Sequence, residues 1–393
     1  MIRLGIVGFG KRLSSLVQMI FRETDPEFSI VGIVDPDEAG AWSRLDEVTR
    51  ETASFYPDLD QMVRASRPDG LMIGTRCNLH ARYACEAAKY GIPLFLEKPV
   101  AVSMEQALKL ERVFEAGDCP VTVSFPLRVS PLCEQTRGLL EEGAVGRPEH
   151  ILGMNYVPYG TVYWEDGYRD YDVTQGLFLQ KATHDFDYMM YLMDTPVVRV
   201  AAMMTCGRVF GGTKSAGLRC SGCDEARTCP ESPENRRRNR SGGVQTDHLC
   251  DFGSDCGSSE KGMNEDSSSA LLEFASGVHG VYTQVFYSRR DAARRGAVIS
   301  GYEGTVSFDW RTNEISRVRH HAPFSDVIRG SADASHFGGD SELARDFAAL
   351  IKHGEAPRAG IREGLQSVYA CLAAKESARS GAFAEVRQVG ALP

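Results

Sequence analysis

Short apolar runs alternate with amphipathic stretches along the first 125 residues of the chain. This alternation is typical of a doubly wound parallel sheet, because each buried strand is followed by a helix that covers it. Ser103, with Gln106 three residues later, predicts the capped start of one such helix. We predict strands over residues 4–7, 30–34, 70–73, 93–96 and 121–125, and helices over residues 80–89 and 103–116.

The hydrophobic pattern changes after residue 125 and predicts an α+β domain with an open, mostly antiparallel sheet. Two alternating runs on either side of Ser276-Gly277 predict a β-hairpin. We therefore expect an α/β domain of the Rossmann type over residues 1–125 and an α+β domain over residues 126–393. In the second domain we predict helices over residues 130–142, 179–192, 341–352 and 361–380, and strands over residues 149–157, 197–205, 270–274, 279–287, 298–300 and 305–308.

One segment of the second domain lacks the aliphatic residues that a core requires. Residues 207–269 are rich in Gly, Ser, Arg and Glu, so we interpret them as a long insertion. Within it, Arg236-Arg237-Arg238-Asn239-Arg240 is either a solvated flexible loop, the interpretation that we favour, or a phosphate-binding patch.

Composition excludes several classes of partner. A net charge of -9 over 393 residues leaves no large basic face for a nucleic acid. No apolar run approaches the roughly 18 residues that a membrane helix needs. The chain starts directly with a predicted strand and without the apolar leader that export requires, so we expect a cytoplasmic protein.

Gly8-Phe9-Gly10 follows a predicted strand and precedes a helix, which is the context of a dinucleotide-binding turn. Such a turn presents backbone N–H groups and a helix N-terminus to a pyrophosphate, here with Lys11 and Arg12 as the first helical residues. Leu13 replaces the third glycine of the usual pattern. Because that glycine serves helix packing, the replacement keeps the cofactor contacts.

Asp35 ends the next strand, at the spacing of a carboxylate that binds the ribose hydroxyls of adenosine. No arginine follows it directly, which predicts NAD rather than NADP. The alternative is that Asp35 only forms a turn before Pro36. Thr75, Asn78 and His80 follow the third strand, where a doubly wound sheet binds its ligand, and Asn78 either contacts the cofactor or caps a helix.

Glu97-Lys98-Pro99 follows the fourth predicted strand. Lysine before proline places a cation on a stiffened backbone at the mouth of the sheet, where the oxygen of an alcohol under oxidation needs its negative charge countered. We include Glu97 and Lys98 in the predicted cofactor site. On its own the triplet is equally compatible with a surface turn.

These motifs together resemble the glucose-fructose oxidoreductase, inositol dehydrogenase and MocA family, and the resemblance covers nearly the whole chain. It rests on the order of the motifs more than on any one of them. In the second domain the matching segments are Arg128 within residues 125–131, Tyr168-Arg169-Asp170, His184-Asp185-Phe186-Asp187, Gly301-Tyr302-Glu303-Gly304 and His336-Phe337-Gly338-Gly339-Asp340.

The resemblance implies an NAD-dependent oxidoreductase that acts on a secondary hydroxyl of a sugar, glycoside or polyol. It implies Lys98 beside the nicotinamide, His184 as the acid/base, and a homodimer or homotetramer joined through the sheet of the second domain. Where many members carry aspartate and glycine, this chain has Gln180 and Ala182, and Lys181 stands three residues before His184. On one helix the two would share a face, so we predict that Lys181 assists catalysis.

An aromatic-rich stretch precedes His184 and predicts carbohydrate contacts. Tyr156 and Trp164 would stack on the apolar side of a sugar, and Arg169 would bind its hydroxyls. We add Arg128 and Asp187 to the predicted substrate site. For each aromatic residue the alternative is packing, and for Asp187 it is orientation of the imidazole or an ion pair elsewhere.

Two other functions stay open. The same family contains NAD-dependent glycoside hydrolases that work by oxidation, elimination, hydration and re-reduction. A second alternative is a non-catalytic sensor that binds a dinucleotide, against which Lys98 and His184 argue.

Several cysteines lie in or beside the insertion. Cys220, Cys223, Cys229 and Cys250 resemble the ligands of a structural zinc site, with Cys256 as an alternative ligand. Metal–thiolate bonds would order a segment that has no apolar core of its own. The alternative is a set of reduced cysteines without a metal.

Overall fold

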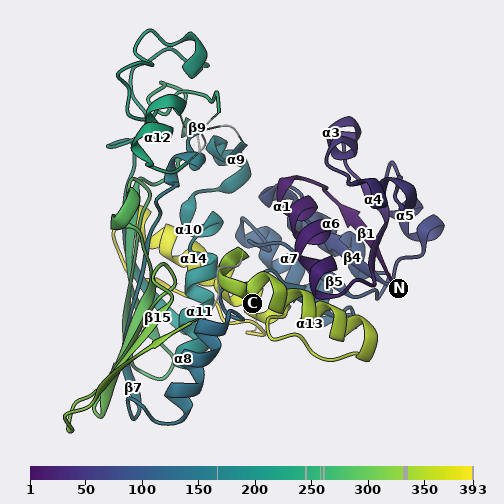
Figure 1. Cartoon of the computed structure of the whole chain (residues 1–393). Helices are drawn as coiled ribbons and strands as arrows, with labels where there is room; N and C mark the ends of the chain where they lie inside the picture. Colours follow the sequence, from purple (N-terminus) through teal and green to yellow (C-terminus); the bar gives the residue numbers. More distant parts are fainter. Residues whose placement is uncertain (166, 244–245, 257, 260–261, 331–334, 392–393) are drawn as a thin grey trace. The chain divides into compact units, whose positions relative to one another are not determined.

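The computed structural model describes residues 1–165, 167–243, 246–256, 258–259, 262–330 and 335–391. The chain divides into two compact units, whose elements are labelled in Figure 1. Unit 1 comprises Met1–Glu134, Ala332–Tyr369 and Gln388–Pro393, and unit 2 comprises Gln135–Ser331 and Ala370–Arg387. The chain therefore returns to the first unit after the second, which a single boundary at residue 125 does not capture.

Unit 1 contains a six-stranded parallel sheet with the order β3-β2-β1-β4-β5-β6. The order 3-2-1-4-5-6 is the one found in doubly wound sheets that bind dinucleotides. The predicted fold class of the first domain is therefore confirmed. The strands are β1 Ile2–Val7, β2 Phe28–Val34, β3 Ser54–Phe55, β4 Gly70–Ile73, β5 Leu94–Leu96 and β6 Val121–Val123.

Helices cover both faces of this sheet. Leu4 and Ile6 of β1 are buried in one core with residues of the helix after the glycine turn and of α13. Gly5 faces the other way because side chains alternate along a strand, and a Cβ there would lie 2.9 Å from Met62 of α5. The helical segments of unit 1 are α1 Lys11–Ser15, η1 Leu16–Phe21, α2 Arg22–Thr24, α3 Glu38–Ser43, α4 Glu47–Thr52, α5 Leu59–Ser66, η2 Cys77–Leu79, α6 His80–Ala88, α7 Met104–Glu115, η7 Ser335–Gly338 and α13 Gly339–His353.

The predicted capped helix is α7. Ser103 Oγ accepts a hydrogen bond from the backbone N of Gln106 at 3.2 Å, and the Gln106 side chain accepts one from the backbone N of Val102 at 3.0 Å. These reciprocal bonds satisfy N–H groups at the start of the helix. The capping prediction is confirmed.

Leu13, which replaces the third glycine of the turn motif, packs against a glycine elsewhere. Leu13 is fully buried, and a Cβ built on Gly74 would lie 2.4 Å from Leu13 Cγ. Gly74 directly follows β4, the strand beside β1. The close approach of helix and sheet is thus kept, with the glycine on the strand side of the contact.

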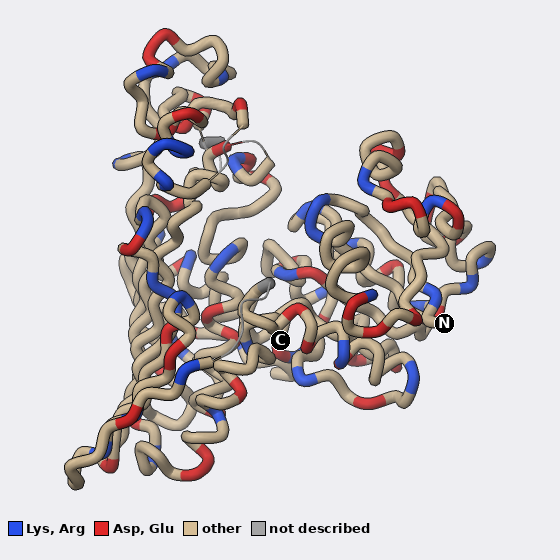
Figure 2. The backbone as a smooth tube through the Cα atoms, viewed as in Figure 1, with Lys and Arg blue, Asp and Glu red and all other residues tan. Residues whose placement is uncertain are grey.

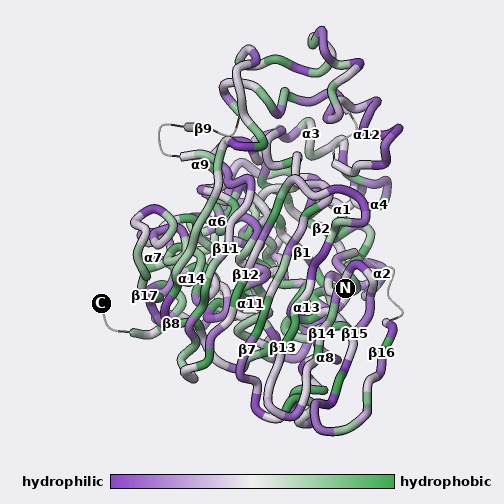
Figure 3. The backbone as a smooth tube through the Cα atoms, turned by 90° about the vertical axis from the view of Figure 1, so that its left-hand side faces the viewer, coloured by the Kyte–Doolittle hydropathy of each residue, from purple (hydrophilic) through white to green (hydrophobic). Residues whose placement is uncertain are grey.

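Unit 2 contains a nine-stranded sheet with the order β16-β15-β14-β13-β7-β12-β11-β8-β17. Its neighbouring strands are antiparallel except β7 and β12, which are parallel. The predicted hairpin is β11 and β12, and Gly277 in its turn has a φ of 85°. Buried and less buried positions alternate along the central strands, which carry both hydrophobic and hydrophilic residues (Figure 3). The strands are β7 Pro148–Tyr156, β8 Val197–Thr205, β11 Ser267–Phe274, β12 His279–Val285, β13 Arg294–Gly301, β14 Gly304–Asp309, β15 Glu314–Arg319, β16 Ser325–Arg329 and β17 Ala384–Glu385.

One face of this sheet is covered by α11 (Thr183–Met193). A Cβ on Gly153 of β7 would lie 2.5 Å from Met189 Sδ, so this glycine permits the close approach of the helix. On the opposite face, Leu271 and Met203 are 51% and 80% exposed. The sheet therefore has one face inside unit 2 and one face, with Leu271 and Met203 exposed among polar residues, that unit 2 does not cover.

The helix predicted over residues 179–192 is in fact two helices, α10 (Leu177–Gln180) and α11. Lys181 lies between them, with φ −116° and ψ −51°. The expectation that Lys181 and His184 share the face of one helix is therefore wrong, because the helix is broken between them. The other helical segments of this part of the chain are α8 Pro131–Glu141, η3 Gly160–Tyr163, η4 Gly167–Arg169, α9 Tyr171–Thr174, η5 Cys220–Gly222, α12 Pro233–Asn239, η6 Arg290–Ala292 and α14 Ile361–Ser380.

The insertion is anchored to the rest of unit 2 and carries charges of both signs (Figure 2). Phe210 and Cys256 pack with Trp164 in a small apolar cluster. Arg236 lies on α12 and is fully buried, so the interpretation of residues 236–240 as a solvated loop is wrong for this residue. Two short strands, β9 Ser258–Ser259 and β10 Gly262–Met263, pair within the segment. Within the described part of the chain, no helix has both the length and the apolar character needed to cross a bilayer.

We predict that Gly74→Ala destabilises the protein by about 1–3 kcal/mol, because the new methyl group overpacks against Leu13. The double variant Gly74→Ala/Leu13→Ala should lose less stability than the sum of the two single variants, as measured by urea unfolding. Gly138→Ala in α8 is the control, since a Cβ there meets nothing within 4 Å. Additive effects of the two substitutions would contradict the packing described.

Candidate functional site

The dinucleotide-binding motifs meet at one edge of the sheet of unit 1. The glycine turn follows β1, Asp35 follows β2, Thr75 lies beyond β4 and Glu97 follows β5. Parallel strands place their carboxyl ends at the same edge, and the strand order reverses between β1 and β4, where such sheets bind ligands. The motifs that the sequence singled out therefore converge on one place within this unit.

Backbone and carboxylate contacts shape the glycine turn. Gly8 N donates to Val34 O at 2.8 Å, and Phe9 N donates to Asp35 Oδ2 at 2.7 Å. The other carboxylate oxygen of Asp35 accepts from Asp37 N at 2.9 Å. Asp35 thus braces the turn with both carboxylate oxygens, as the turn-forming alternative weighed from the sequence expects, and a contact of Asp35 with a ribose stays a prediction.

The two positions of the turn hold glycine for different reasons. Gly8 has a φ of 82°, and a Cβ there would lie 2.8 Å from the backbone of Thr75, so only glycine fits. Gly10 has an ordinary φ of −75°, and a Cβ there would meet no atom within 4 Å. Open space beside Gly10 fits a ligand that approaches the backbone closely, as a pyrophosphate does.

Arg12 is bound to carboxylates. Its Nε donates to Glu97 Oε1 at 3.0 Å, and its two terminal nitrogens donate to Asp340 of α13 at 2.9 and 2.6 Å. Burial alone would raise the pKa of Asp340, but hydrogen bonds from Arg12 and His336 hold that pKa well below its usual range. Arg12, which we predicted to bind the cofactor, therefore holds Glu97 beside the turn, and the structure gives no support to a direct phosphate contact.

His80 has a bracing role. Its two ring nitrogens face Pro99 O at 2.8 Å and Thr75 O at 3.0 Å, and burial lowers its pKa. His80 thus joins the loop after β4 to the Glu97-Lys98-Pro99 segment. The cofactor contact predicted for its side chain is replaced by these two contacts to the protein.

Asn78 caps neither η2 nor α6, so the capping alternative is excluded. Its Oδ1 is buried and has no hydrogen-bond partner among the described residues. Lys98 is half-buried and Lys11 is exposed. Sequence reasoning missed Arg44, whose Nε donates to Phe9 O at 2.9 Å beside the turn.

In unit 2, Lys181 forms a close pair with a tyrosine that the sequence did not single out for catalysis. Lys181 is buried and its Nζ donates to Tyr159 Oη at 2.9 Å. Arg311 lies over the same ring, 5.9 Å from its centroid. The pair brings a buried ammonium and a phenol into direct contact, an arrangement that stabilises the phenolate.

The charges around this pair shift its acidity. Burial raises the pKa of Tyr159, but the positive charges of Lys181 and Arg295 and the hydrogen bond from Lys181 outweigh it and lower the pKa to about 7. Burial lowers the pKa of Lys181, and its interaction with Tyr159 opposes this shift. Tyr159 is thus able to exchange a proton near neutral pH, as a general base requires.

A buried ion pair between Arg295 and Asp185 places a further positive charge near Tyr159. Arg295 donates two hydrogen bonds to Asp185, at 3.0 and 3.1 Å, and both residues are buried. Asn155 and Tyr282 also donate to Asp185, each at 2.9 Å. Asp185 of the His184-Asp185-Phe186-Asp187 motif therefore has a structural role that its sequence position did not reveal.

Three of the other residues that we predicted for catalysis or substrate binding are buried. His184 is buried near the start of α11, and Asp187 is fully buried on the same helix. Trp164 is also fully buried, where it packs against Phe210 with ring centroids 4.2 Å apart. The substrate-binding interpretation of Trp164 is therefore wrong, because the side chain has no surface to offer a sugar.

Arg169 and Arg128 have partners within the protein. Arg169 donates to Asp255 at 3.0 Å, and Arg128 donates to the carbonyl oxygen of Arg358 at 3.4 Å. Tyr156 is half-buried at the end of β7. Of the residues predicted to bind substrate, Tyr156 thus retains the most accessible surface.

Two family models match this chain. The first, described as an oxidoreductase family with an NAD-binding Rossmann fold, matches residues 2–125, and the second, a GFO/IDH/MocA C-terminal domain, matches residues 133–307. The chain belongs to the Gfo/Idh/MocA oxidoreductase family. The resemblance inferred from the order of the motifs is confirmed, as is NAD binding as a property of the matched domain.

The curated relatives in this family are distant. The chain is 27% identical to the rhizopine catabolism protein MocA of Rhizobium meliloti over 56% of this chain and 67% of that protein. It is 25% identical to an inositol 2-dehydrogenase of Corynebacterium glutamicum, over 51% of this chain and 56% of that protein. Glycosyl hydrolase family 109 protein 2 of Akkermansia muciniphila is 34% identical over 29% of this chain and 25% of that protein. The chain spans about half the length of the curated relatives that it matches.

Solved structures share the whole fold. A levoglucosan dehydrogenase in complex with NADH and L-sorbose superposes with a TM-score of 0.76 at 17% identity and covers 100% of both chains. An oxidoreductase of Agrobacterium radiobacter in complex with NAD+, L-tartaric acid and magnesium gives a TM-score of 0.72 at 17% identity, covering 98% of each chain. At this identity the likeness establishes the fold alone.

We predict that one of the 14 tyrosines titrates near pH 7, as measured by the ultraviolet absorbance of phenolate. The signal should vanish in Tyr159→Phe. It should move toward the ordinary phenol pKa of about 10 in Lys181→Met, because the stabilising ammonium is gone. Tyr168→Phe, which removes a partly exposed tyrosine, is the control. An unchanged titration in Lys181→Met would contradict the assignment.

Proposed function

We propose that this protein is an NAD-dependent oxidoreductase that acts on a secondary hydroxyl of a sugar, glycoside or polyol. The observation that carries the proposal is the buried Lys181–Tyr159 pair, with its 2.9 Å hydrogen bond and a phenol pKa lowered to about 7. Removal of a hydroxyl proton at neutral pH requires a base of this kind. The dehydrogenases among the relatives favour a polyol or sugar substrate.

The cofactor in this proposal is NAD. Gly8 and Gly10 supply the close backbone approach for the pyrophosphate, and Asn78 Oδ1 is an available acceptor. Asp35 would accept hydrogen bonds from a ribose and would repel a 2′-phosphate, which favours NAD over NADP. Arg44 lies beside the turn, where its Nε donates to Phe9 O at 2.9 Å and its Nη2 lies 3.9 Å from Asp37 Oδ2.

The bound NAD would supply the hydride acceptor. Tyr159, as its phenolate, would take the hydroxyl proton, and Lys181 would stabilise the phenolate charge. Lys98 would hold the substrate oxygen as negative charge develops there. His184, predicted from the sequence as the acid/base, would hydrogen-bond the substrate, and Tyr156 would contact its apolar side.

A screen of sugars, polyols and glycosides with NAD tests this proposal, with NADH absorbance and release of the aglycone followed in parallel. Lys98→Ala should lower kcat by roughly 10²–10³-fold on the best substrate, because charge stabilisation is lost, while NAD affinity stays within a few-fold. Lys352→Ala is the matched control, since this lysine is paired with Asp25 and Glu27. Full activity of Lys98→Ala would contradict the role of Lys98. NAD binding without any turnover would favour the sensor alternative.

The pH profile of the same reaction separates the two candidate bases. Tyr159→Phe should lose the rise of kcat/KM through pH 7, whereas His184→Gln should keep the rise at a lower rate. The opposite result would return the acid/base role to His184.

A redox-neutral glycosidase is the second candidate, favoured by the 34% identity to a glycosyl hydrolase over 123 residues. In that reaction, oxidation, elimination, hydration and re-reduction release the aglycone with no net NADH. Solvent deuterium would enter the sugar at the carbon beside the oxidised one. Sustained growth of NADH absorbance without aglycone release would exclude this candidate.

We also propose a homodimer or homotetramer that packs through the uncovered face of the nine-stranded sheet. Leu271 and Met203 lie on this face and are 51% and 80% exposed. An apolar surface of this kind is typical of an oligomer interface. A monomeric mass by light scattering would contradict this arrangement.

A further inference from the structure

Four cysteines of the insertion line one enclosed cavity in unit 2. They are Cys220, Cys223, Cys229 and Cys250, with His248 beside them. The cavity has a free volume of about 10 Å³, about the space of one water-sized particle. These are the four residues whose spacing suggested a metal site, and only the fold of the insertion brings them together.

Backbone hydrogen bonds hold two of the cysteine-bearing segments in register. Cys223 N donates to Cys220 O at 3.2 Å, which places these two residues on one short turn. Cys220 N donates to His248 O at 3.0 Å, and Cys250 N donates to Leu218 O at 2.7 Å. Cys250 is therefore held opposite the turn that carries Cys220 and Cys223.

The other cysteines near the insertion lie elsewhere. Cys206 Sγ contacts Met263 O at 3.9 Å. Cys256, the alternative ligand suggested by the sequence, is fully buried in the apolar cluster, with its Sγ 3.5 Å from Trp164 O. The cavity is thus left with four thiols, the number that a closed tetrahedral zinc site requires.

Nitrogen donors face two of the four sulfurs. His248 Nε2 lies 3.5 Å from Cys220 Sγ, and Lys214 Nζ lies 3.8 Å from Cys223 Sγ. The other ring nitrogen of His248 faces Leu249 O at 2.8 Å. Because both ring nitrogens face acceptors, His248 supports the sulfurs from outside and does not serve as a ligand.

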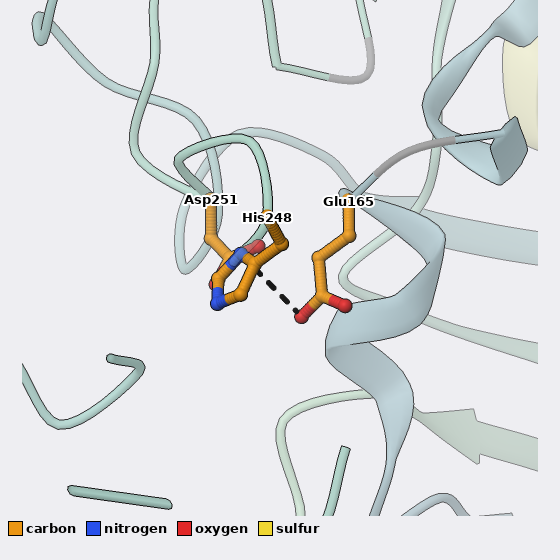
Figure 4. Close-up of side chains that lie close together, drawn as sticks. All are labelled: Glu165, His248 and Asp251. Atoms are coloured by element: carbon orange, nitrogen blue, oxygen red, sulfur yellow. Dashed lines mark ion pairs between the residues drawn. The ribbon is translucent and has the colours of Figure 1, made fainter. Parts of the chain in front are cut away.

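Among the described His, Cys, Asp and Glu side chains, the neighbouring trio Glu165, His248 and Asp251 brings three potential ligand atoms within 4.8 Å of one another (Figure 4). This trio already surrounds a cation. Arg236 donates to Glu165 at 2.5 Å and to Asp251 at 2.8 Å. Arg236 already pairs with both carboxylates of this trio, so we take the thiol cavity as the candidate.

We propose that the insertion binds one structural zinc ion through Cys220, Cys223, Cys229 and Cys250. Binding would convert four thiols to thiolates and release four protons, and the bound ion would form four zinc–sulfur bonds. The resulting double negative charge would lie next to Lys214 and His248. With all four positions filled by sulfur, the ion has no place for a substrate, so its role is to hold the insertion together.

The zinc content of the full-length protein, measured by mass spectrometry after exchange into metal-free buffer, tests this proposal. We expect about one zinc per chain. Cys223→Ser and Cys250→Ser should each lose the ion, and Cys206→Ser, in the same part of the chain but outside the cavity, should keep it. Replacement of zinc by cobalt should give the visible absorption bands of a tetrahedral thiolate site.

A chelator experiment on the unsubstituted protein avoids dependence on variants that fail to fold. Removal of zinc should make the insertion sensitive to protease and expose four additional reactive thiols, and added zinc should reverse both changes. Protein without bound metal that resists protease equally well would overturn the proposal, as would bound iron with inorganic sulfide. Neither outcome would bear on the proposed oxidoreductase activity, which rests on other residues.

Discussion

The ion pairs of Arg12 hold the candidate dinucleotide site of unit 1 in shape. One guanidinium joins the helix after the glycine turn to Glu97 at the end of β5 and to Asp340 of α13. Loss of the guanidinium would remove its ion pairs with two buried carboxylates, which is costly in a protein interior. Because Lys98 follows Glu97 directly, the position of the predicted catalytic ammonium depends on this network.

Unit 2 also contains buried cations that are paired with acidic side chains. Arg295 is paired with Asp185 in a buried two-point ion pair, whereas Lys181 is hydrogen-bonded to the phenol of Tyr159. The first pair is between groups that are ordinarily charged, and in the second the ammonium of Lys181 lowers the pKa of the Tyr159 phenol. Cations matched by carboxylates thus build the frame, and the cation matched by a weak acid supplies the reactivity that we propose.

Local patterns in the sequence were sufficient for most of the strands, the capped start of α7 and the β11–β12 hairpin, because hydrophobic period, capping residues and turn glycines act over a few residues. The break between α10 and α11 was not predictable in this way, since no Gly or Pro lies between Leu177 and Met193. The side-chain contacts of the site could not be predicted from local patterns either, because the partners are far apart in the sequence. Tyr159 is 22 residues from Lys181, and Arg295 is 110 residues from Asp185. Cysteine spacing suggested a metal site, but the choice between Cys250 and Cys256 required the fold.

The most direct test of the account is the thermal midpoint of Gly10→Val with and without NAD. A Cβ at Gly10 meets no protein atom within 4 Å and the φ of −75° suits any residue, so the variant without NAD should melt at about the same temperature as the unsubstituted protein. NAD at 100 times its Kd should stabilise the unsubstituted protein by about 2.7 kcal/mol and should leave the variant unchanged, because valine would occupy the place of the pyrophosphate. Equal stabilisation of both proteins by NAD would contradict the claim that this turn binds the dinucleotide.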